Sequence, residues 1–276
     1  MLLKIAGISK QIFYYELKHF DDKNQKDSFY EDLILEIFQN NYEKYGVPRM
    51  TIAVNQRLNE LGKESINHKK VERLMTKLGI QARPKQRKYI SYKGNVGKVA
   101  PNVLNRDFVA ELPYQKLGTD ITVFIMPFGK LYLSPIVDFL TREVLAYDLS
   151  EHPDFRQINR MFEMLKKRHG INVSGAILHS DQGWQYQMSK YREKLKELEI
   201  TQSMSRKGNC LDDSPTENFF GRMKEEMFFG KENNYKNMSQ LKNAIHEYIN
   251  YYNNERIVTR LRMSPVQYRI ETFGLV

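Results

Sequence analysis

From about residue 105 onward, apolar runs of strand length alternate with amphipathic runs of helical length. The expected strands are Leu117–Met126, Leu131–Leu140, Glu143–Ser150, Val173–Leu178 and Ile200–Met204. The expected helices carry Phe155 to Leu165, Met188 to Leu198, a segment from about Ser214, and a long stripe from Leu241 to Tyr252. This order of strands and helices predicts an α/β domain over residues 105–270, with a mixed sheet and helices packed on its faces.

Residues 1–80 have a different texture and are expected to form a small all-α region of short helices. Ser9 is expected to cap a helix that carries Ile12, Phe13 and Leu17. The apolar stripes of three further helices are Leu33, Ile34, Ile37 and Phe38, then Met50, Val54, Leu58 and Leu61, then Val71, Leu74, Met75 and Leu78. Asn67 is expected to cap the last of these helices, which ends at Gly79.

The outer face of that last helix is basic and consists of Lys69, Lys70, Arg73 and Lys77. Two helices joined by a few residues, the second of them basic, match the helix-turn-helix pattern, in which the second helix contacts DNA. A helical hairpin with an ordinary solvated face has the same pattern. The residues alone leave both interpretations open.

Residues 81–104 are predicted to be an exposed basic linker between the two regions. The cations that stand out as candidate DNA contacts are Arg83, Lys85, Arg87 and Lys88, and the linker contains no acidic residue. Lysine and arginine suit phosphate contacts, and the interleaved Tyr89 and Tyr92 could stack on bases. A merely solvated linker is the alternative.

The net charge and the residue composition limit the kinds of partner and site that are expected. The formal net charge is +10 and the pI is about 9.4, a surplus that favours polyanionic partners, of which nucleic acid is the commonest. A soluble protein that happens to be basic is an equal alternative on charge alone. The single cysteine excludes an internal disulfide and a Cys-rich zinc site. No run approaches the roughly 18 apolar residues that span a bilayer, so no membrane association and a cytoplasmic location are expected.

Asp120 is the least ordinary residue of the C-terminal region. It interrupts a strand between Thr119 and Ile121, and burying an unpaired carboxylate there costs several kcal/mol unless a partner such as a metal compensates. An outward-facing strand position, or a nearby lysine, is the alternative explanation.

Two further acidic residues complete a candidate set. Asp181 directly follows a buried strand, at the kind of sheet edge where catalytic groups collect, although Ser-Asp-Gln-Gly is also an ordinary turn. Glu217 is the third helical residue in Ser214-Pro215-Thr216-Glu217, which is also a complete capping box. Together the three carboxylates could hold two Mg²⁺ ions that act on a phosphodiester. Lys224, two turns after Glu217 on the same face, could hold a DNA phosphate beside them or be an ordinary exposed lysine.

Several segments resemble a known family, the second reading frame (OrfB) of two-frame bacterial insertion-sequence transposases. The segments around the three acids are Leu117–Thr122, His179–Tyr186 and Ser214–Phe220, with thirty-five residues between Asp181 and Glu217. Further matches are Arg206–Asp212, Tyr251–Arg256, Ser264–Arg269, Tyr45–Arg49 and Asn67–Val71. Two positions depart from the family pattern: Leu117 stands where tryptophan is common, and Asp213 stands where asparagine is common.

The resemblance implies an RNase H-like integrase core and a DDE-type polynucleotidyl transferase that cuts and joins insertion-element ends. Asp120, Asp181 and Glu217 would be its catalytic and metal-binding residues, with two Mg²⁺ ions for which Mn²⁺ could substitute. DNA contacts are expected from Lys224, Arg206 and Lys207. A homo-oligomer on bacterial nucleoid DNA is expected too.

The resemblance also implies a partner. Only five residues precede the turn at Ala6–Ser9, which suggests that the product of an upstream frame (OrfA), or a fusion with it, completes the enzyme. The alternative from another class is a catalytically inert DNA-binding regulator derived from a transposase. A nuclease that cuts RNA–DNA hybrids without joining ends is a third reading of the same acids.

Overall fold

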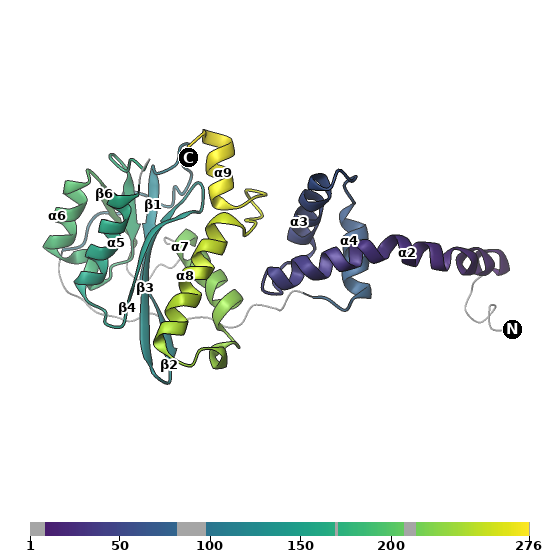
Figure 1. Ribbon diagram of the computed structural model, residues 1–276. Helices are drawn as coiled ribbons and strands as arrows, with labels where there is room; N and C mark the ends of the chain where they lie inside the picture. Colours follow the sequence, from purple (N-terminus) through teal and green to yellow (C-terminus); the bar gives the residue numbers. More distant parts are fainter. Residues whose placement is uncertain (1–8, 82–97, 169–170, 207–213, 276) are drawn as a thin grey trace. The chain divides into compact units, whose positions relative to one another are not determined.

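The computed structural model describes residues 9–81, 98–168, 171–206 and 214–275; for residues 12–13, 15–26 and 214 it describes the backbone alone. The chain divides into two compact units, Met1–Pro84 and Lys85–Val276 (Figure 1). Each unit buries its own set of apolar side chains. The N-terminal unit is helical, and the C-terminal unit contains the sheet.

Helix α2 runs from Lys10 to Asn40 as one helix of 31 residues, so the expectation of two separate helices in this segment is wrong. The apolar stripe lapses over residues 21–28, and that lapse favours a break. The polar residues there include neither proline nor glycine, however, so the helical hydrogen bonds continue through them. The expected stripe Ile12, Phe13 and Leu17 lies outside the described side chains.

Helices α3 (Val47–Glu60) and α4 (His68–Lys77) complete the N-terminal unit. Their buried side chains are Met50, Val54, Leu58, Val71, Leu74 and Met75, as the apolar stripes predict. Leu61 is an exception, because α3 ends at Glu60 and the Leu61 side chain is 48% exposed.

Two asparagines fix the connection between α3 and α4. Asn67 caps α4 as predicted, and its Oδ1 accepts the backbone N–H of Lys69 at 3.0 Å. The side chain of Asn55 accepts the N–H of Ile66 at 2.8 Å and donates to the C=O of the same residue at 3.1 Å. The turn between the helices is therefore held from both ends.

Within the described residues the sheet of the C-terminal unit has six strands in the order β2-β3-β1-β5-β6, and β4 pairs with β3. The strands are β1 (Lys116–Thr119), β2 (Thr122–Met126), β3 (Gly129–Asp138), β4 (Val144–Ser150), β5 (Ile177–Ser180) and β6 (Thr201–Met204). Strand β3 is antiparallel to β1, β2 and β4, whereas β5 is parallel to both β1 and β6.

Strands β1 and β2 are two halves of one interrupted strand. Thr119 of β1 faces Ile136 of β3, and Thr122 of β2 faces Leu133, so the register along β3 is the same on both sides of the gap. The interruption falls at Asp120, as the sequence predicts.

The strand boundary that differs most from the prediction is the start of β5. Strand β5 begins at Ile177 rather than Val173, because residues 173–176 form a turn. Gly175 adopts a φ of +79° there, and the N–H of Ala176 donates to the C=O of Val173 at 3.0 Å. Only glycine takes that conformation without strain, which an apolar run does not reveal.

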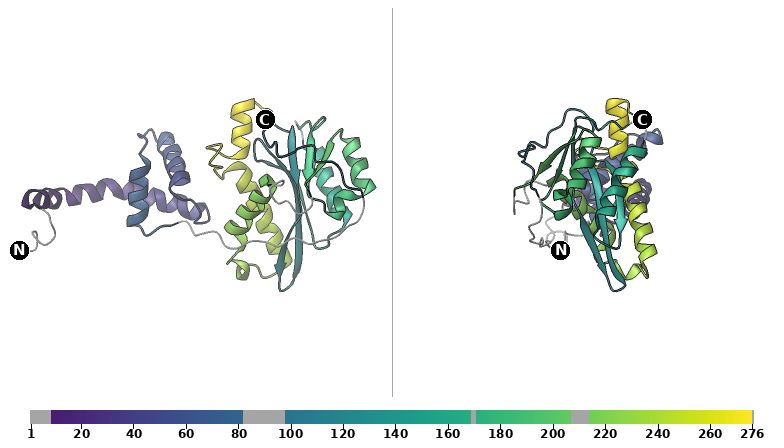
Figure 2. Two further views of the ribbon diagram at one scale, coloured as in Figure 1. Left: turned by 180° about the vertical axis from the view of Figure 1, so that it is seen from behind. Right: turned by 90° about the vertical axis from the view of Figure 1, so that its left-hand side faces the viewer.

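Helices cover both faces of the sheet (Figures 1 and 2). Helices α5 (Phe155–Lys167) and α6 (Ser189–Glu197) lie on one face and share a core cluster with residues of β1, β3, β4 and β5. Helices α7 (Ser214–Met223) and α8 (Met238–Asn254) lie on the other face, and α9 (Pro265–Phe273) follows α8. The predicted mixed sheet flanked by helices is confirmed.

Gly118 allows α7 to lie directly on β1. A Cβ atom at this position would lie 2.3 Å from Oγ1 of Thr216 and 2.4 Å from a ring carbon of Phe139, far inside van der Waals contact. Thr216 belongs to the first turn of α7. The absence of a side chain at residue 118 therefore sets how closely that turn, which carries Glu217, approaches β1.

Replacing Gly118 with alanine should push the first turn of α7 off the sheet. We expect Gly118→Ala to lower the free energy of unfolding by about 1–3 kcal/mol, the usual cost of overpacking a core. Urea unfolding followed by circular dichroism measures this loss. The same substitution made in a Phe139→Leu background should cost less, since one of the two clashes is relieved. A Gly118→Ala protein as stable as the wild type would contradict the close approach.

Candidate active site

Asp120 and Asp181 leave neighbouring parallel strands at the same edge of the sheet. In the pairing of β1 with β5, Gly118 lies beside His179. Asp120 and Asp181 each lie two residues beyond this pair, so the same register sets them opposite each other. Neighbouring strands lie about 4.8 Å apart, and equivalent positions point to the same face. The strand pairing therefore brings these two predicted residues side by side.

Local backbone bonds orient both aspartates. Oδ1 of Asp120 accepts the N–H of Ile121 at 2.6 Å, and Oδ1 of Asp181 accepts the N–H of Gly183 at 2.8 Å. A Cβ at residue 183 would lie 2.9 Å from that same Asp181 oxygen. A side chain at residue 183, two positions after this acid, would therefore displace the carboxylate. Both carboxylates are half-buried at the ends of their strands.

Glu217 approaches this region from α7, which packs on the face of the sheet that Gly118 leaves open. It lies in the first turn of α7, next to Thr216, which packs over Gly118 two residues before Asp120. Its side chain is exposed. The Ser214 side chain of the predicted capping box lies outside the described residues, so the capping role of Glu217 stays a prediction.

The three acids interact electrostatically. Burial raises the pKa of Asp120 well above its usual range, and the negative charges of Asp181 and Glu217 raise it further. Burial also raises the pKa of Asp181 and of Glu217. Like charges held near one another in a partly buried site destabilise one another's ionised forms, and a bound cation would relieve that cost.

Lys224 is half-buried at the same site rather than an exposed surface lysine. Its Nζ donates to the C=O of Val123 at 2.9 Å and lies 5.3 Å from the centre of the Phe124 ring. Burial lowers the pKa of Lys224 to about 8, and the charge of Asp120 opposes that shift. The predicted cation therefore stands within electrostatic range of the acids, held against β2.

The ligand type and the negative charge of these three acids suit a divalent metal ion. Carboxylate oxygens are the ligands that Mg²⁺ prefers. The pKa of Asp120 is raised first by burial and then by repulsion from Asp181 and Glu217, and a cation would offset both costs. In the part of the chain that the structure describes, no three His, Cys, Asp or Glu side chains are gathered closely enough to hold a metal ion. The backbone thus brings the three acids to one edge of the sheet, but their side chains are not gathered closely enough to coordinate one ion together.

Three of the four cations on the basic face of α4 pair with acids of α2. Asp27 of α2 pairs with Arg73 at 2.6 Å and with Lys70 at 3.2 Å, and Glu31 pairs with Lys77 at 2.7 Å. These three predicted DNA contacts thus help to hold the two helices together. Lys69, the fourth, is exposed.

Of the six predicted DNA contacts other than Lys224 and the four in α4, the structure describes only one, Arg206. Arg206 is exposed, and its Nη2 donates to Oδ1 of Asn105 at 2.6 Å. The remaining positions, Arg83, Lys85, Arg87, Lys88 and Lys207, lie outside the described residues.

Tyr186 lies near the acids but was not predicted from the sequence as a site residue. It lies in the short helix η1 (Trp184–Gln187) and is buried, with its ring 5.3 Å from that of Tyr191. Burial raises its pKa, and the charges of Asp120 and Asp181 raise it further, which places it beside both. An aromatic residue five positions after Asp181 was the available signal, but a tyrosine there also suits an ordinary core.

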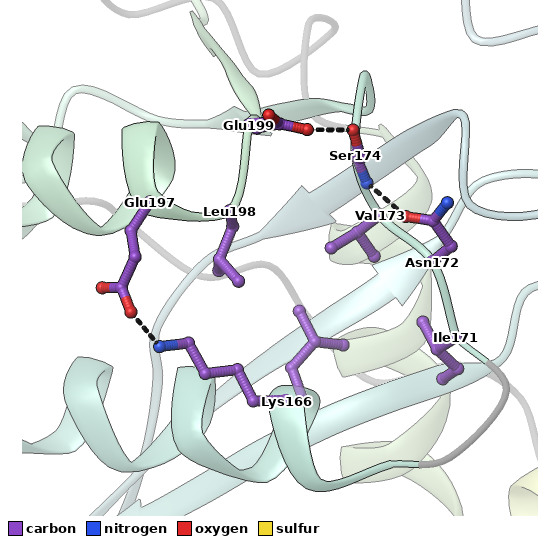
Figure 3. Close-up of a pocket in the computed structure, with 9 residues that line it drawn as sticks. Lys166, Ile171, Asn172, Val173, Ser174, Glu197, Leu198 and Glu199 are labelled. Carbon is purple, nitrogen blue, oxygen red and sulfur yellow. Dashed lines mark hydrogen bonds and ion pairs between the residues drawn. The ribbon is translucent and has the colours of Figure 1, made fainter.

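A cavity of about 310 Å³ lies elsewhere in the C-terminal unit (Figure 3). Its lining includes Val173 and Ser174, which precede β5, and Leu198 and Glu199, which precede β6. Because β5 and β6 are parallel, this is the edge opposite to Asp181. The cavity is therefore separate from the acidic edge.

A mixed sheet flanked by helices on both faces, preceded by a helical unit, is the architecture of an RNase H-like integrase core. Family models agree with this reading. A model described as "Integrase core domain" matches residues 110–210, a second with the same description matches 217–273, and an "HTH-like domain" matches 25–88.

Curated relatives identify the family. The chain is 44% identical to the putative transposase InsK for insertion sequence element IS150 of Escherichia coli, over 99% of this chain and 93% of that protein. It is 52% identical to an uncharacterized transposase-like protein of Haemophilus influenzae, over 76% of this chain and 95% of that protein. The chain belongs to the family of insertion-sequence transposases that contain an integrase core and a helix-turn-helix-like domain.

A solved structure of the HTLV-2 integrase catalytic core domain in complex with magnesium is a distant match. It has 16% sequence identity and a TM-score of 0.45, over 58% of this chain and 98% of that one. The family assignment depends on the sequence relatives instead. Among the described residues, none of the helices has the length and apolar character needed to cross a membrane.

Lys224 should titrate near pH 8 in the metal-free protein, against an ordinary lysine value of 10.5. Reductive ¹³C-methylation gives an NMR signal for each lysine, and Lys224→Arg identifies the one that belongs to Lys224. Because the charge of Asp120 stabilises the protonated amine, Asp120→Asn should move the midpoint to still lower pH. A Lys224 midpoint above pH 10 would contradict the described burial.

Proposed function

We propose that this chain is a metal-dependent DNA strand transferase that cleaves the ends of an insertion element and joins them to a target. The observation that carries the proposal is the placement of three acids by independent parts of the fold. The parallel register of β1 and β5 sets Asp120 beside Asp181, and the contact of α7 with Gly118 brings the charge of Glu217 within reach of Asp120.

Asp120, Asp181 and Glu217 would hold two Mg²⁺ ions, or Mn²⁺ in their place, through carboxylate oxygens. When bound, the ions supply activation of the attacking hydroxyl and stabilisation of the leaving phosphodiester oxygen. The two aspartates directly follow strands, and backbone N–H groups orient both carboxylates before any ion binds.

Lys224 would hold a DNA phosphate beside the acids. The pKa of about 8 reflects a buried ammonium, and a phosphate in contact would favour its protonated form. Water and then a freed 3′-hydroxyl would attack in line, and no covalent intermediate with the protein is implied.

The wider DNA interface is proposed from exposed or linker cations. We assign phosphate contacts to Lys69 and Arg206, which are exposed, and to Lys207, Arg83, Lys85, Arg87 and Lys88. Lys70, Arg73 and Lys77 would contribute through the outer side of their ion pairs with α2. The same proposal includes assembly as a homo-oligomer on DNA and action together with an upstream-frame product.

Asp181→Asn should abolish strand cleavage while leaving DNA binding intact. Altering a residue that merely supports a metal ligand costs about 10- to 100-fold, so loss of a ligand should cost at least about 100-fold. Nicking and joining of a labelled element-end duplex with Mg²⁺ measures this, and a gel-shift assay measures binding. The matched control is Asp107→Asn, an exposed aspartate that pairs with Lys116. Equal cleavage by the wild type and Asp181→Asn would refute the proposal.

Metal binding can be measured without DNA or catalysis. Trp184 is the only tryptophan of the chain, is 41% exposed, and lies three residues after Asp181. Paramagnetic Mn²⁺ bound at Asp181 should quench its fluorescence with saturation. Asp181→Asn and Asp120→Asn should both remove the saturable phase. Identical quenching in all three proteins would place any bound manganese away from these acids.

A further inference from the structure

Helix α7 changes its geometry at Lys224. Residues Lys224–Phe228 form the π-helical segment η3, in which the N–H of Phe229 donates to the C=O of Lys224 at 2.7 Å, five residues back. Three consecutive side chains of η3, Glu226, Met227 and Phe228, are buried. A π-helix has more residues per turn than an α-helix, so the rotation from one side chain to the next is smaller. Three consecutive side chains can therefore all face the interior.

Glu226 is fixed in that interior by a two-pronged ion pair. Its Oε2 and Oε1 accept from Nε and Nη2 of Arg256 at 2.7 and 2.6 Å, and the hydroxyl of Tyr248 donates to Oε2 at 2.8 Å. The Glu226 and Arg256 side chains are only 4% and 5% exposed. A bidentate pair of this kind fixes direction as well as distance. It ties η3 to Tyr248 of α8 and to Arg256, the second residue after that helix.

The same π turn holds Lys224 in place. Phe228 packs edge-on against Phe124 of β2, with ring centres 5.0 Å apart. The Phe124 ring in turn lies 5.3 Å from Nζ of Lys224, which donates to the neighbouring Val123. Any rotation of η3 about its axis would therefore shift Phe228, the Phe124 ring and the Lys224 ammonium together.

Residues before Arg256 extend this support to α7 and the sheet. The ring of Tyr252 packs edge-on against Phe219 of α7 at 4.9 Å. The side chain of Asn253 accepts the N–H of Val144 and donates to its C=O, both at 2.9 Å. The segment Tyr251–Arg256, which the sequence analysis matched only as a family motif, thus joins β4, α7 and η3.

We propose that Glu226 and Arg256 are positioning residues for Lys224. The buried pair holds the π turn in the one orientation that directs the Lys224 ammonium toward the acids and β2. This inference rests on the proposed function, since it assigns the pair to the positioning of the cation that would hold the DNA phosphate. Neither residue would touch DNA or metal.

The first measurement tests position without catalysis. In the ¹³C-methylated protein the Phe124 ring should shift the Lys224 methyl signal away from those of solvent-exposed lysines. Glu226→Gln, which keeps the side-chain size, should return that signal toward the exposed group, and Tyr248→Phe should move it part of the way. Glu143→Gln is the matched control, because Glu143 is a buried acid that pairs with Arg168 and Arg269, outside η3. An unchanged Lys224 signal in folded Glu226→Gln would overturn the proposal.

The second measurement tests whether the pair acts through Lys224. Displacing a positioned group by about 1 Å can cost up to about 100-fold in rate, so Glu226→Gln should lower the strand-cleavage rate by about 10- to 100-fold. In a Lys224→Ala background the same substitution should cost little more, because the group it positions is gone. Equal losses in both backgrounds would overturn the proposal. If the wild type itself fails to cleave, the proposed function fails, and the NMR result alone decides whether the pair positions Lys224.

Discussion

The parallel pairing of β1 with β5 is the contact on which the rest of the candidate site depends. It sets Asp120 and Asp181 at equivalent positions of adjacent strands, although sixty residues separate them in the chain. It also places the gap between β1 and β2 at the sheet edge where β5 ends. The two acids then share a partly buried environment in which burial and the charge of Asp181 make the ionised form of Asp120 more costly, and a bound cation would offset that cost.

Helix α7 brings the other charged groups to that edge, and it is held at both ends. Its first turn lies on Gly118, where only a residue without a side chain fits, and its last turn passes into a π segment anchored by Glu226 and Arg256. Glu217 stands near the first anchor and Lys224 near the second. The arrangement explains how Glu217 approaches β1 while Lys224, seven residues later, contacts β2 on the other side of the gap.

Much of this could be read from the sequence. Strand and helix periodicity predicted the mixed sheet, the interruption at Asp120 and the cap at Asn67, because these depend on residues close together in the chain. Two helices were expected where α2 is one continuous helix. The polar stretch between the two apolar stripes contains no proline or glycine, and such a stretch does not by itself end a helix. The pairing of Lys70, Arg73 and Lys77 with α2 was missed for another reason. Their partners, Asp27 and Glu31, lie more than forty residues away, and a basic stripe looks the same whether it faces acids or solvent.

The central claim is that Asp120 and Asp181, with Glu217, form one metal site. Anomalous diffraction from crystals grown with Mn²⁺ tests it most directly, because manganese scatters anomalously and carbon, nitrogen and oxygen do so hardly at all. The account predicts an anomalous peak within coordination distance of both Asp120 and Asp181, with the Glu217 carboxylate turned toward the same density. Manganese bound elsewhere, or no peak at this edge under saturating Mn²⁺, would contradict it.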